Sequence, residues 1–237
     1  KVDGPRIIIR NFEKFLRSRN RYAVFRVTKN SGEGDLVYRQ AQKYYKDKSG
    51  IDYIMELACQ EDSRIKEYLS MEAVVKKDAP EEIIEEFRKW LQRRKPYETF
   101  NAKVLGSTTK GRSILSRGRN HLGAWEGFRF LLGITQKLEP EIMKYSTFEA
   151  VLREDGPKQF VDMFNFYMEN REEGEVFGSS YLRTNKRLRE EFGTAGAKLY
   201  ENALHHFKEQ GGIQFIIELA GRDNPELLQH WKYVPRK

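Results

Sequence analysis

Internal repetition constrains this sequence more than any other feature, because tandem copies of one segment build tandem copies of one structural unit. The segment that begins at Gly50, GIDYIMELA, returns at Gly212 as GIQFIIELA. A weaker copy, GFRFLLGIT, begins at Gly127 and has the same apolar spacing. The three segments indicate that one unit occurs three times along the chain.

Other blocks recur in the same register. An Asp-x-Pro triplet begins at Asp3, Asp78 and Asp155, and a Phe follows each Pro seven residues later. From residue 35 to 80 the first two copies align at an offset of 77 residues without a gap. We therefore predict three tandem helical repeats, which form three domains over residues 3–77, 78–154 and 155–237.

Each repeat is predicted to contain about four helices, and the fold class is all-α. Apolar residues of the segment 80–93 recur at helical spacing, and no window shows sustained period-two alternation. The Asp-x-Pro triplets are expected to start helices, since Asp caps an N-terminus and Pro is tolerated in the first turn. Gly50, Gly127 and Gly212 are expected to break the second helix of each repeat from a short apolar third helix.

Composition excludes several classes of protein. Hydrophobic residues make up 39% of the chain and aromatic residues 13%, which is too much apolar surface for a disordered chain. No stretch approaches eighteen uncharged apolar residues, so we expect no transmembrane helix and no membrane partner. Cys59 is the only cysteine, which excludes multi-cysteine zinc sites and fits an intracellular compartment, cytoplasmic or nuclear. The four histidines lack metal-ligand spacing, and no catalytic motif is present, so we predict no metal, no cofactor and no catalytic residue.

The net charge of +8 is unevenly distributed along the chain. The predicted repeats carry balances of +5, +3 and −1 in chain order. A basic surface of this kind is typical of proteins that bind polyanions. Repeats one and two are therefore expected to make most of the contacts with a nucleic acid.

The segment from Thr99 to Trp125 sharpens this prediction, because it contains no acidic residue. Basic side chains alternate there with Gly, Ser and Thr, a mixture that suits phosphate binding. A helix is expected to begin near Thr109 or Gly111, with its N-terminus as an anion site and with Arg112 and Arg119 on one face. The acidic pairs at 81–82 and 85–86 are expected to be solvated. The predicted nucleic-acid contacts are Lys103, Lys110, Arg112, Arg117 and Arg119 in this segment, Arg19, Arg21, Arg26 and Lys29 in the loop of repeat one, and Lys186 and Arg187 in that of repeat three. The alternative is that these are solvated loop charges of a basic protein.

Part of repeat two resembles a known family. The run from Thr109, TKGRSILSR, continues to LEPEIMKY, which ends at Tyr145, and this pattern is similar to the SAM-like core-binding domain of tyrosine recombinases. The resemblance covers about fifty residues of each repeat and implies a helical unit that grips duplex DNA through helix termini and basic residues. Position 186 is Lys where the recombinase catalytic domain has His, so catalytic roles are not carried over. A degenerate recombinase-like enzyme remains a minor alternative.

Two functions from different classes follow from these patterns. The favoured one is a non-catalytic protein that binds DNA or RNA through basic loops between helices, contacting the phosphate backbone. The alternative is a helical scaffold or a self-assembling, nucleoprotein-like or coat-like module, which binds protein partners or its own copies through grooves between repeats. Phosphate contacts release counterions, so the first function predicts binding that weakens steeply with salt.

Overall fold

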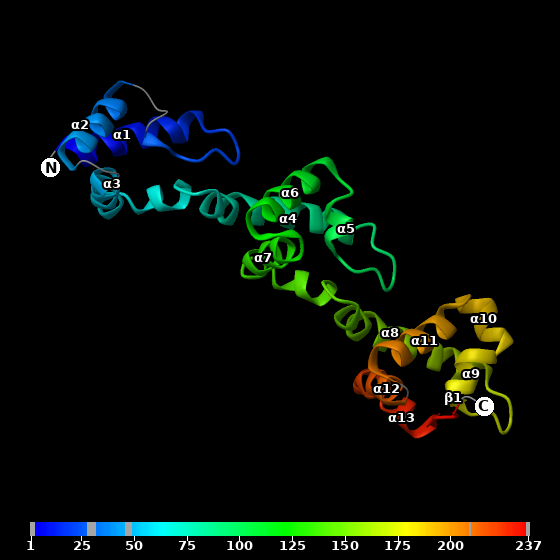
Figure 1. The fold of residues 1–237 in the computed structure, drawn as a ribbon. Coiled ribbons are helices and arrows are strands. Elements are labelled where there is room, and N and C mark those ends of the chain that lie inside the picture. Colours follow the sequence, from blue (N-terminus) through cyan, green and yellow to red (C-terminus); the bar gives the residue numbers. More distant parts are fainter. Residues whose placement is uncertain (1–2, 28–31, 46–48, 209, 236–237) are drawn as a thin grey trace. The chain divides into compact units, whose positions relative to one another are not determined.

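The computed structural model describes residues 3–27, 32–45, 49–208 and 210–235, and its fold is all-α (Figure 1). The described strands are two short segments, β1 (Phe177–Gly178) and β2 (Trp231–Lys232), which pair in parallel. The predicted fold class is therefore confirmed. The number of repeats and their boundaries stay predictions.

The chain divides into two compact units. Unit 1 contains Lys1–Lys89 and Ala102–Glu139, and unit 2 contains Trp90–Asn101 and Pro140–Lys237. Helices that begin in unit 1 are α1 (Asp3–Ser18), α2 (Gly32–Tyr45), α3 (Ser49–Glu61), the 3₁₀-helix η2 (Ser63–Tyr68), α4 (Met71–Leu91), α5 (Ala102–Leu105), α6 (Thr109–Leu122) and α7 (Ala124–Gln136). Helices of unit 2 are the 3₁₀-helix η3 (Pro140–Tyr145), α8 (Phe148–Asn170), α9 (Ser179–Thr184), α10 (Lys186–Phe192), α11 (Ala195–Phe207), α12 (Gln210–Asp223) and α13 (Glu226–His230).

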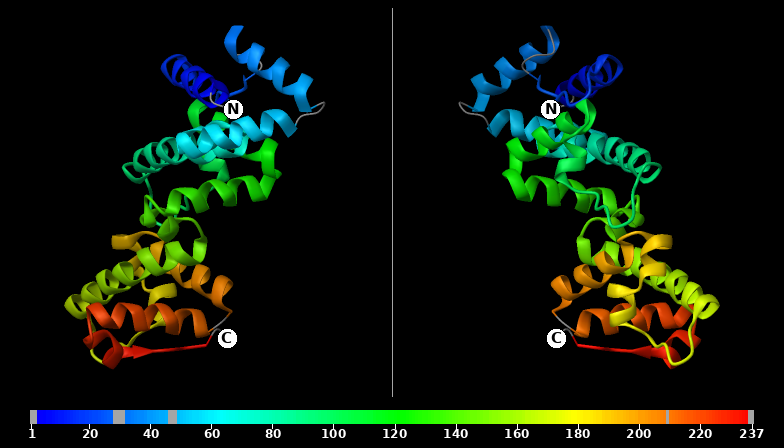
Figure 2. Two further views of the ribbon diagram at one scale, coloured as in Figure 1. Left: turned by 90° about the vertical axis from the view of Figure 1, so that its left-hand side faces the viewer. Right: turned by 90° about the vertical axis from the view of Figure 1, so that its right-hand side faces the viewer.

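Each unit has an aromatic-rich core. In unit 1, Phe12 of α1 packs edge-on against Phe25 with ring centroids 5.2 Å apart, and its ring centroid lies 5.7 Å from that of Tyr68. In unit 2, Phe164 of α8 contacts Phe177 at the same centroid distance of 5.2 Å. Figure 2 shows α8, α11 and α12 close together, and α12 contacts both α8 and α11.

Two long helices run through the Asp-x-Pro triplets, so the expectation that these triplets start helices is wrong at Asp78 and Asp155. Both residues lie inside helices, α4 and α8, together with the Pro that follows each of them. The helix N-termini are capped earlier, where Ser70 Oγ accepts the Ala73 N–H at 3.1 Å and Thr147 Oγ1 accepts the Ala150 N–H at 3.1 Å. The two Asp carboxylates are therefore free to bind groups outside their own helices.

The recurring glycines mark close approaches between helices, not helix breaks as expected. Gly127 lies inside α7, and a Cβ there would come within 2.6 Å of the Gly118 carbonyl oxygen of α6. Only a residue without a side chain allows the two backbones to pack this closely. The break between α6 and α7 lies at Gly123, whose φ is +83°. The same relation holds at Gly50, whose Cβ would lie 2.8 Å from the Ala41 carbonyl oxygen, and at Gly212, whose Cβ would lie 2.1 Å from that of Ala203.

We expect Gly127→Ala to destabilise the protein by about 1–3 kcal/mol, because the new methyl group meets backbone atoms that cannot move aside. Gly133→Ala in the same helix is the matched control, since nothing lies within 4 Å of a Cβ at that position. It should be neutral or raise the free energy of unfolding by up to about 1 kcal/mol through helix propensity. Equilibrium urea unfolding measures both changes, and equal effects of the two substitutions would contradict the close approach.

Candidate nucleic-acid interface

Helix α6 begins where the sequence predicted. Thr108 caps it, accepting the Gly111 N–H at 3.0 Å and donating its own hydroxyl hydrogen to Glu86 at 2.6 Å. A Cβ on Gly111 would lie 1.9 Å from the carbonyl oxygen of Leu105, so a glycine is required for α5 to contact the first turn of α6. Ile114 and Gly118 are buried, which turns the opposite face of α6 outward.

The outward face of α6 is lined by hydrogen-bond donors. It borders a hollow of about 490 Å³. No acidic residue occurs between Thr99 and Trp125, so this face has no carboxylate of its own. Hydroxyl, amide and guanidinium groups are the side chains that contact phosphate oxygens in nucleic-acid complexes. The residues that line the hollow are Thr109, Arg112, Ser113, Ser116, Arg117 and Asn120.

Three arginines of α6 are exposed and have no carboxylate partner within the described ranges. Arg112 donates from Nε to the Gly106 carbonyl oxygen at 3.4 Å, and the Arg117 guanidinium lies 5.3 Å from the centre of the Tyr22 ring. The hollow contains Arg112 and Arg117, whereas Arg119 lies on α6 outside its lining. The positive charge of this face is therefore not neutralised by neighbouring side chains.

The N-terminus of α6 differs from the anion site expected there. Lys110 forms an ion pair with Glu85, and hydrogen bonds from Lys110 and Lys89 lower the pKa of Glu85 to about 2. Glu86 also lies at this terminus and is only 8% exposed. A phosphate placed here would meet two carboxylates, so the favourable position shifts along α6 toward Arg112. Lys103, in α5, lies outside the lining of the hollow.

Arg19 is part of a largely buried ion pair. Its guanidinium contacts Asp78 of α4, and the two side chains are 14% and 9% exposed. The guanidinium also lies over the Tyr68 ring, 4.7 Å from its centre. Asp78 accepts a second hydrogen bond, from the Tyr22 N–H at 3.0 Å. Arg19 therefore stabilises the contact between its loop and α4 and is not available to bind a phosphate.

One carboxylate of each acidic pair of α4 is buried, Glu82 and Glu86, which corrects the expectation that both pairs are solvated; Glu81 and Glu85 are exposed as expected. Glu82 is 4% exposed and accepts a hydrogen bond from the Tyr22 hydroxyl at 2.7 Å. Arg21 forms an ion pair with the same carboxylate. The two residues are 61 positions apart in the sequence, and no local pattern indicates their contact.

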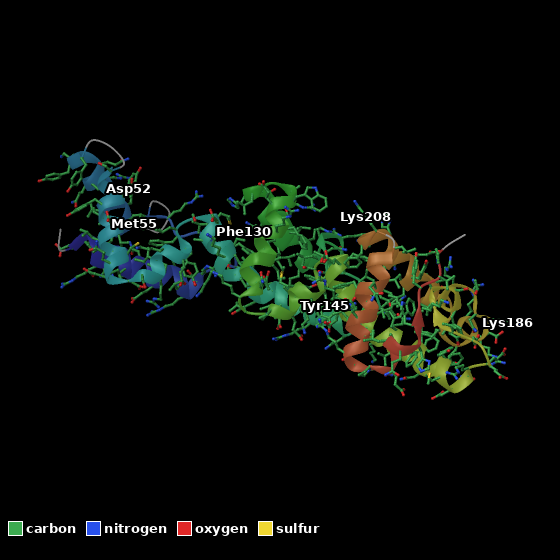
Figure 3. All side chains as sticks on the ribbon, turned by 90° about the horizontal axis from the view of Figure 1, so that it is seen from below. Asp52, Met55, Phe130, Tyr145, Lys186 and Lys208 are labelled. Carbon is green, nitrogen blue, oxygen red and sulfur yellow. The ribbon has the colours of Figure 1, made fainter. Side chains whose placement is uncertain are left out.

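The other predicted contacts are dispersed. Arg26 is exposed and has no ion-pair partner among the described residues, and Lys29 lies outside them. In unit 2, Lys186 (labelled in Figure 3) begins α10 and lies 3.8 Å from Glu190. Arg187 forms an ion pair with Glu172 at 3.0 Å. Of the predicted residues, the structure thus brings Arg112 and Arg117 together at one hollow.

Neither a metal-binding cluster nor a membrane-spanning helix accompanies this face in the described residues. In the part of the chain that the structure describes, no group of three His, Cys, Asp or Glu residues could hold a metal ion. No described helix combines the length and apolar character needed to span a membrane. No known protein family, curated protein or solved structure matches the chain. The resemblance to the recombinase core-binding domain stays a prediction.

We expect Arg19→Ala to lower the free energy of unfolding by about 2–3 kcal/mol, because it leaves the buried carboxylate of Asp78 without its counter-ion. Arg39→Ala is the matched control, since the Arg39 side chain is 75% exposed and pairs with Asp35 one helical turn away. Such an exposed pair contributes less than about 1 kcal/mol. Urea unfolding of the two variants measures the difference, and equal stabilities would show that the Asp78 contact is not structural.

Burial and the nearby Asp78 carboxylate raise the pKa of Tyr22 from 10.0 to about 12. The folded state therefore binds the phenol proton more tightly than the unfolded state does. The resulting stabilisation is complete below pH 10 and is lost as the pH rises toward 12. Tyr22→Phe should lose less stability than the parent over this interval, as followed by urea unfolding at several pH values. Tyr44→Phe, at an 87% exposed position, should behave as the parent does.

Proposed function

We propose that the chain is a non-catalytic nucleic-acid-binding protein that contacts the phosphate backbone through the outward face of α6. One observation carries this proposal: Arg112 and Arg117 share a hollow with hydroxyl and amide donors, and no carboxylate of the described residues forms an ion pair with them. Arg19, Arg187 and Lys110, in contrast, form ion pairs within the chain. A polyanion would therefore bind most favourably at the outward face of α6.

The chemistry of this face favours the phosphate backbone over base edges. Its lining consists of side chains with hydrogen-bond donors and includes no aromatic ring on which an unpaired base would stack. Guanidinium groups bind phosphate through paired hydrogen bonds, and hydroxyl groups add neutral ones. The expected ligand is DNA or RNA bound with little dependence on sequence.

Fluorescence anisotropy with single- and double-stranded DNA and RNA tests this function. Binding should weaken steeply between roughly 50 and 200 mM salt, because each phosphate contact releases counterions. Arg112→Ala combined with Arg117→Ala should weaken binding at low salt about tenfold or more and lower the salt slope by about two, one for each lost contact.

Two controls make this experiment specific. Arg39→Ala removes the same charge from an exposed position outside the hollow, so it should leave the salt slope nearly unchanged. Lys110→Ala should have a smaller effect than Arg112→Ala, because its ammonium group pairs with Glu85. A parent protein that binds none of the four nucleic acids would refute the function. Equal salt slopes for the parent and the double variant would refute the site.

A further inference from the structure

One of the three tryptophans projects into solvent. Trp125, the second residue of α7, is 76% exposed, whereas Trp90 is only 8% exposed. Within the described ranges, no aromatic ring and no side-chain cation stacks on Trp125. A Trp ring left in water forgoes the large gain in free energy that its burial would bring. Its exposure therefore points to a role outside the core.

Helix packing does not use this side chain. The residues of α7 that face the interior include Gly127, Phe128, Leu131 and Leu132, all of which are buried. Trp125 lies in the middle of the sequence, in a described segment that extends well beyond it on both sides. The ring is therefore exposed although the structure describes the chain before and after it.

The surroundings of Trp125 are cationic. Helices α6 and α7 (green in Figure 1) pack together as a hairpin that turns at Gly123. From residue 109 to residue 136 the hairpin contains five Lys and Arg residues and one acidic residue, Glu126. Arg119 and Arg129 are exposed and form no ion pair with the residues that the structure describes. The Trp ring thus belongs to a surface with an excess of positive charge.

The single carboxylate of the hairpin lies at the start of its own helix. The Glu126 Oε2 atom is 3.9 Å from the position that a Cβ of Gly123 would occupy. Gly123 precedes α7, and a carboxylate at a helix N-terminus is stabilised by the helix dipole. Glu126 therefore compensates the helix terminus and leaves Arg119 and Arg129 without a counter-ion.

An exposed ring among unpaired cations favours one kind of occupant. An apolar protein surface would cover the ring but would also desolvate the charges beside it. An unpaired nucleobase offers a flat face to the ring, and its phosphates bind the cations. In an intact duplex the base faces are covered by neighbouring base pairs, so the ring favours a single strand.

The ring lies within reach of the hollow on α6. No aromatic residue lines that hollow, whose last lining residue along the chain is Asn120. Trp125 follows five residues later, and five residues span at most about 17 Å. A strand with one phosphate every ~3.4 Å covers this distance in about five nucleotides. One short segment can therefore contact both places.

We propose that Trp125 stacks on an unpaired base of a single-stranded DNA or RNA segment whose phosphates bind the outward face of α6. Arg129, one helical turn after Trp125 on the same side of α7, binds a phosphate next to that base. This inference rests on the proposed function and adds strand selectivity to it. Stacking tolerates every base, so it adds little dependence on sequence.

Fluorescence anisotropy with a labelled single strand of roughly 15 nucleotides and with its duplex tests the proposal. Trp125→Ala should weaken binding of the single strand about tenfold, which is the typical effect of losing one stacked base. It should leave duplex binding and the salt slope nearly unchanged, because it removes no charge. Trp125→Phe keeps a ring and should recover much of the affinity. The side chain is exposed, so both variants should fold, and circular dichroism verifies this.

A strand without bases makes the test specific. An abasic oligonucleotide keeps its phosphates, so the parent and Trp125→Ala should bind it equally. The intrinsic fluorescence of the parent should be quenched by the base-containing strand, and that of Trp125→Phe should not. Tyr44→Ala removes another exposed aromatic ring, 87% exposed and outside the hairpin, and it should bind as the parent does.

The failures of the two proposals are distinguishable. A parent that binds no nucleic acid would refute the proposed function together with this inference. Salt-dependent binding that is the same in the parent and in Trp125→Ala would refute the stacking alone, and an equal loss for single strand and duplex would refute the strand selectivity. Sedimentation velocity of the nuclease-treated chains checks the other occupant. Association of the parent that Trp125→Ala abolishes would assign the ring to a second copy of the chain and overturn the inference.

Discussion

A carboxylate held by one guanidinium and one backbone N–H is the interaction on which the rest of the structure depends. It occurs at Asp78 and again at Asp155, each time inside a long helix and each time with a loop residue at positive φ. A mostly buried carboxylate is destabilising without its counter-ion, so the helix and the loop are fixed in register. In each helix this Asp lies two residues before the Pro that the helix contains.

Ion pairs of this kind determine which Lys and Arg side chains remain available to bind an external anion. Forty-three Lys and Arg residues are present, but many of those nearest the loops neutralise carboxylates within the chain. Arg21, for example, pairs with a Glu82 side chain that is 5% exposed. The outward face of α6 lies in a stretch without acidic residues, and its arginines keep their charge. The proposed nucleic-acid contact thus uses arginines that form no ion pair with the described residues, such as Arg112.

Backbone packing sets the second constraint. Helix pairs approach so closely at Gly50, Gly127 and Gly212 that a Cβ would overlap a carbonyl oxygen of the neighbouring helix. A Cβ on Gly111, at the start of α6, would likewise overlap the carbonyl oxygen of Leu105 in α5. The position of the donor-lined face therefore depends on glycines that do not themselves line it. Gly174 differs from these glycines, because its φ is +78° and nothing lies within 4 Å of a Cβ at that position.

The sequence alone determined the helical class, the start of α6 and the acid-free segment that contains Arg112 and Arg117. These features are local, since helical periodicity, capping and charge content are properties of neighbouring residues. The tertiary structure alone decided that Arg19 is buried against Asp78, 59 positions away, and that Glu82 is shielded from solvent. Which charges meet depends on the distance between folded segments, and a buried pair and a solvated pair have the same sequence pattern. The sequence pattern shows where charged residues recur, but only the fold shows which of them form ion pairs.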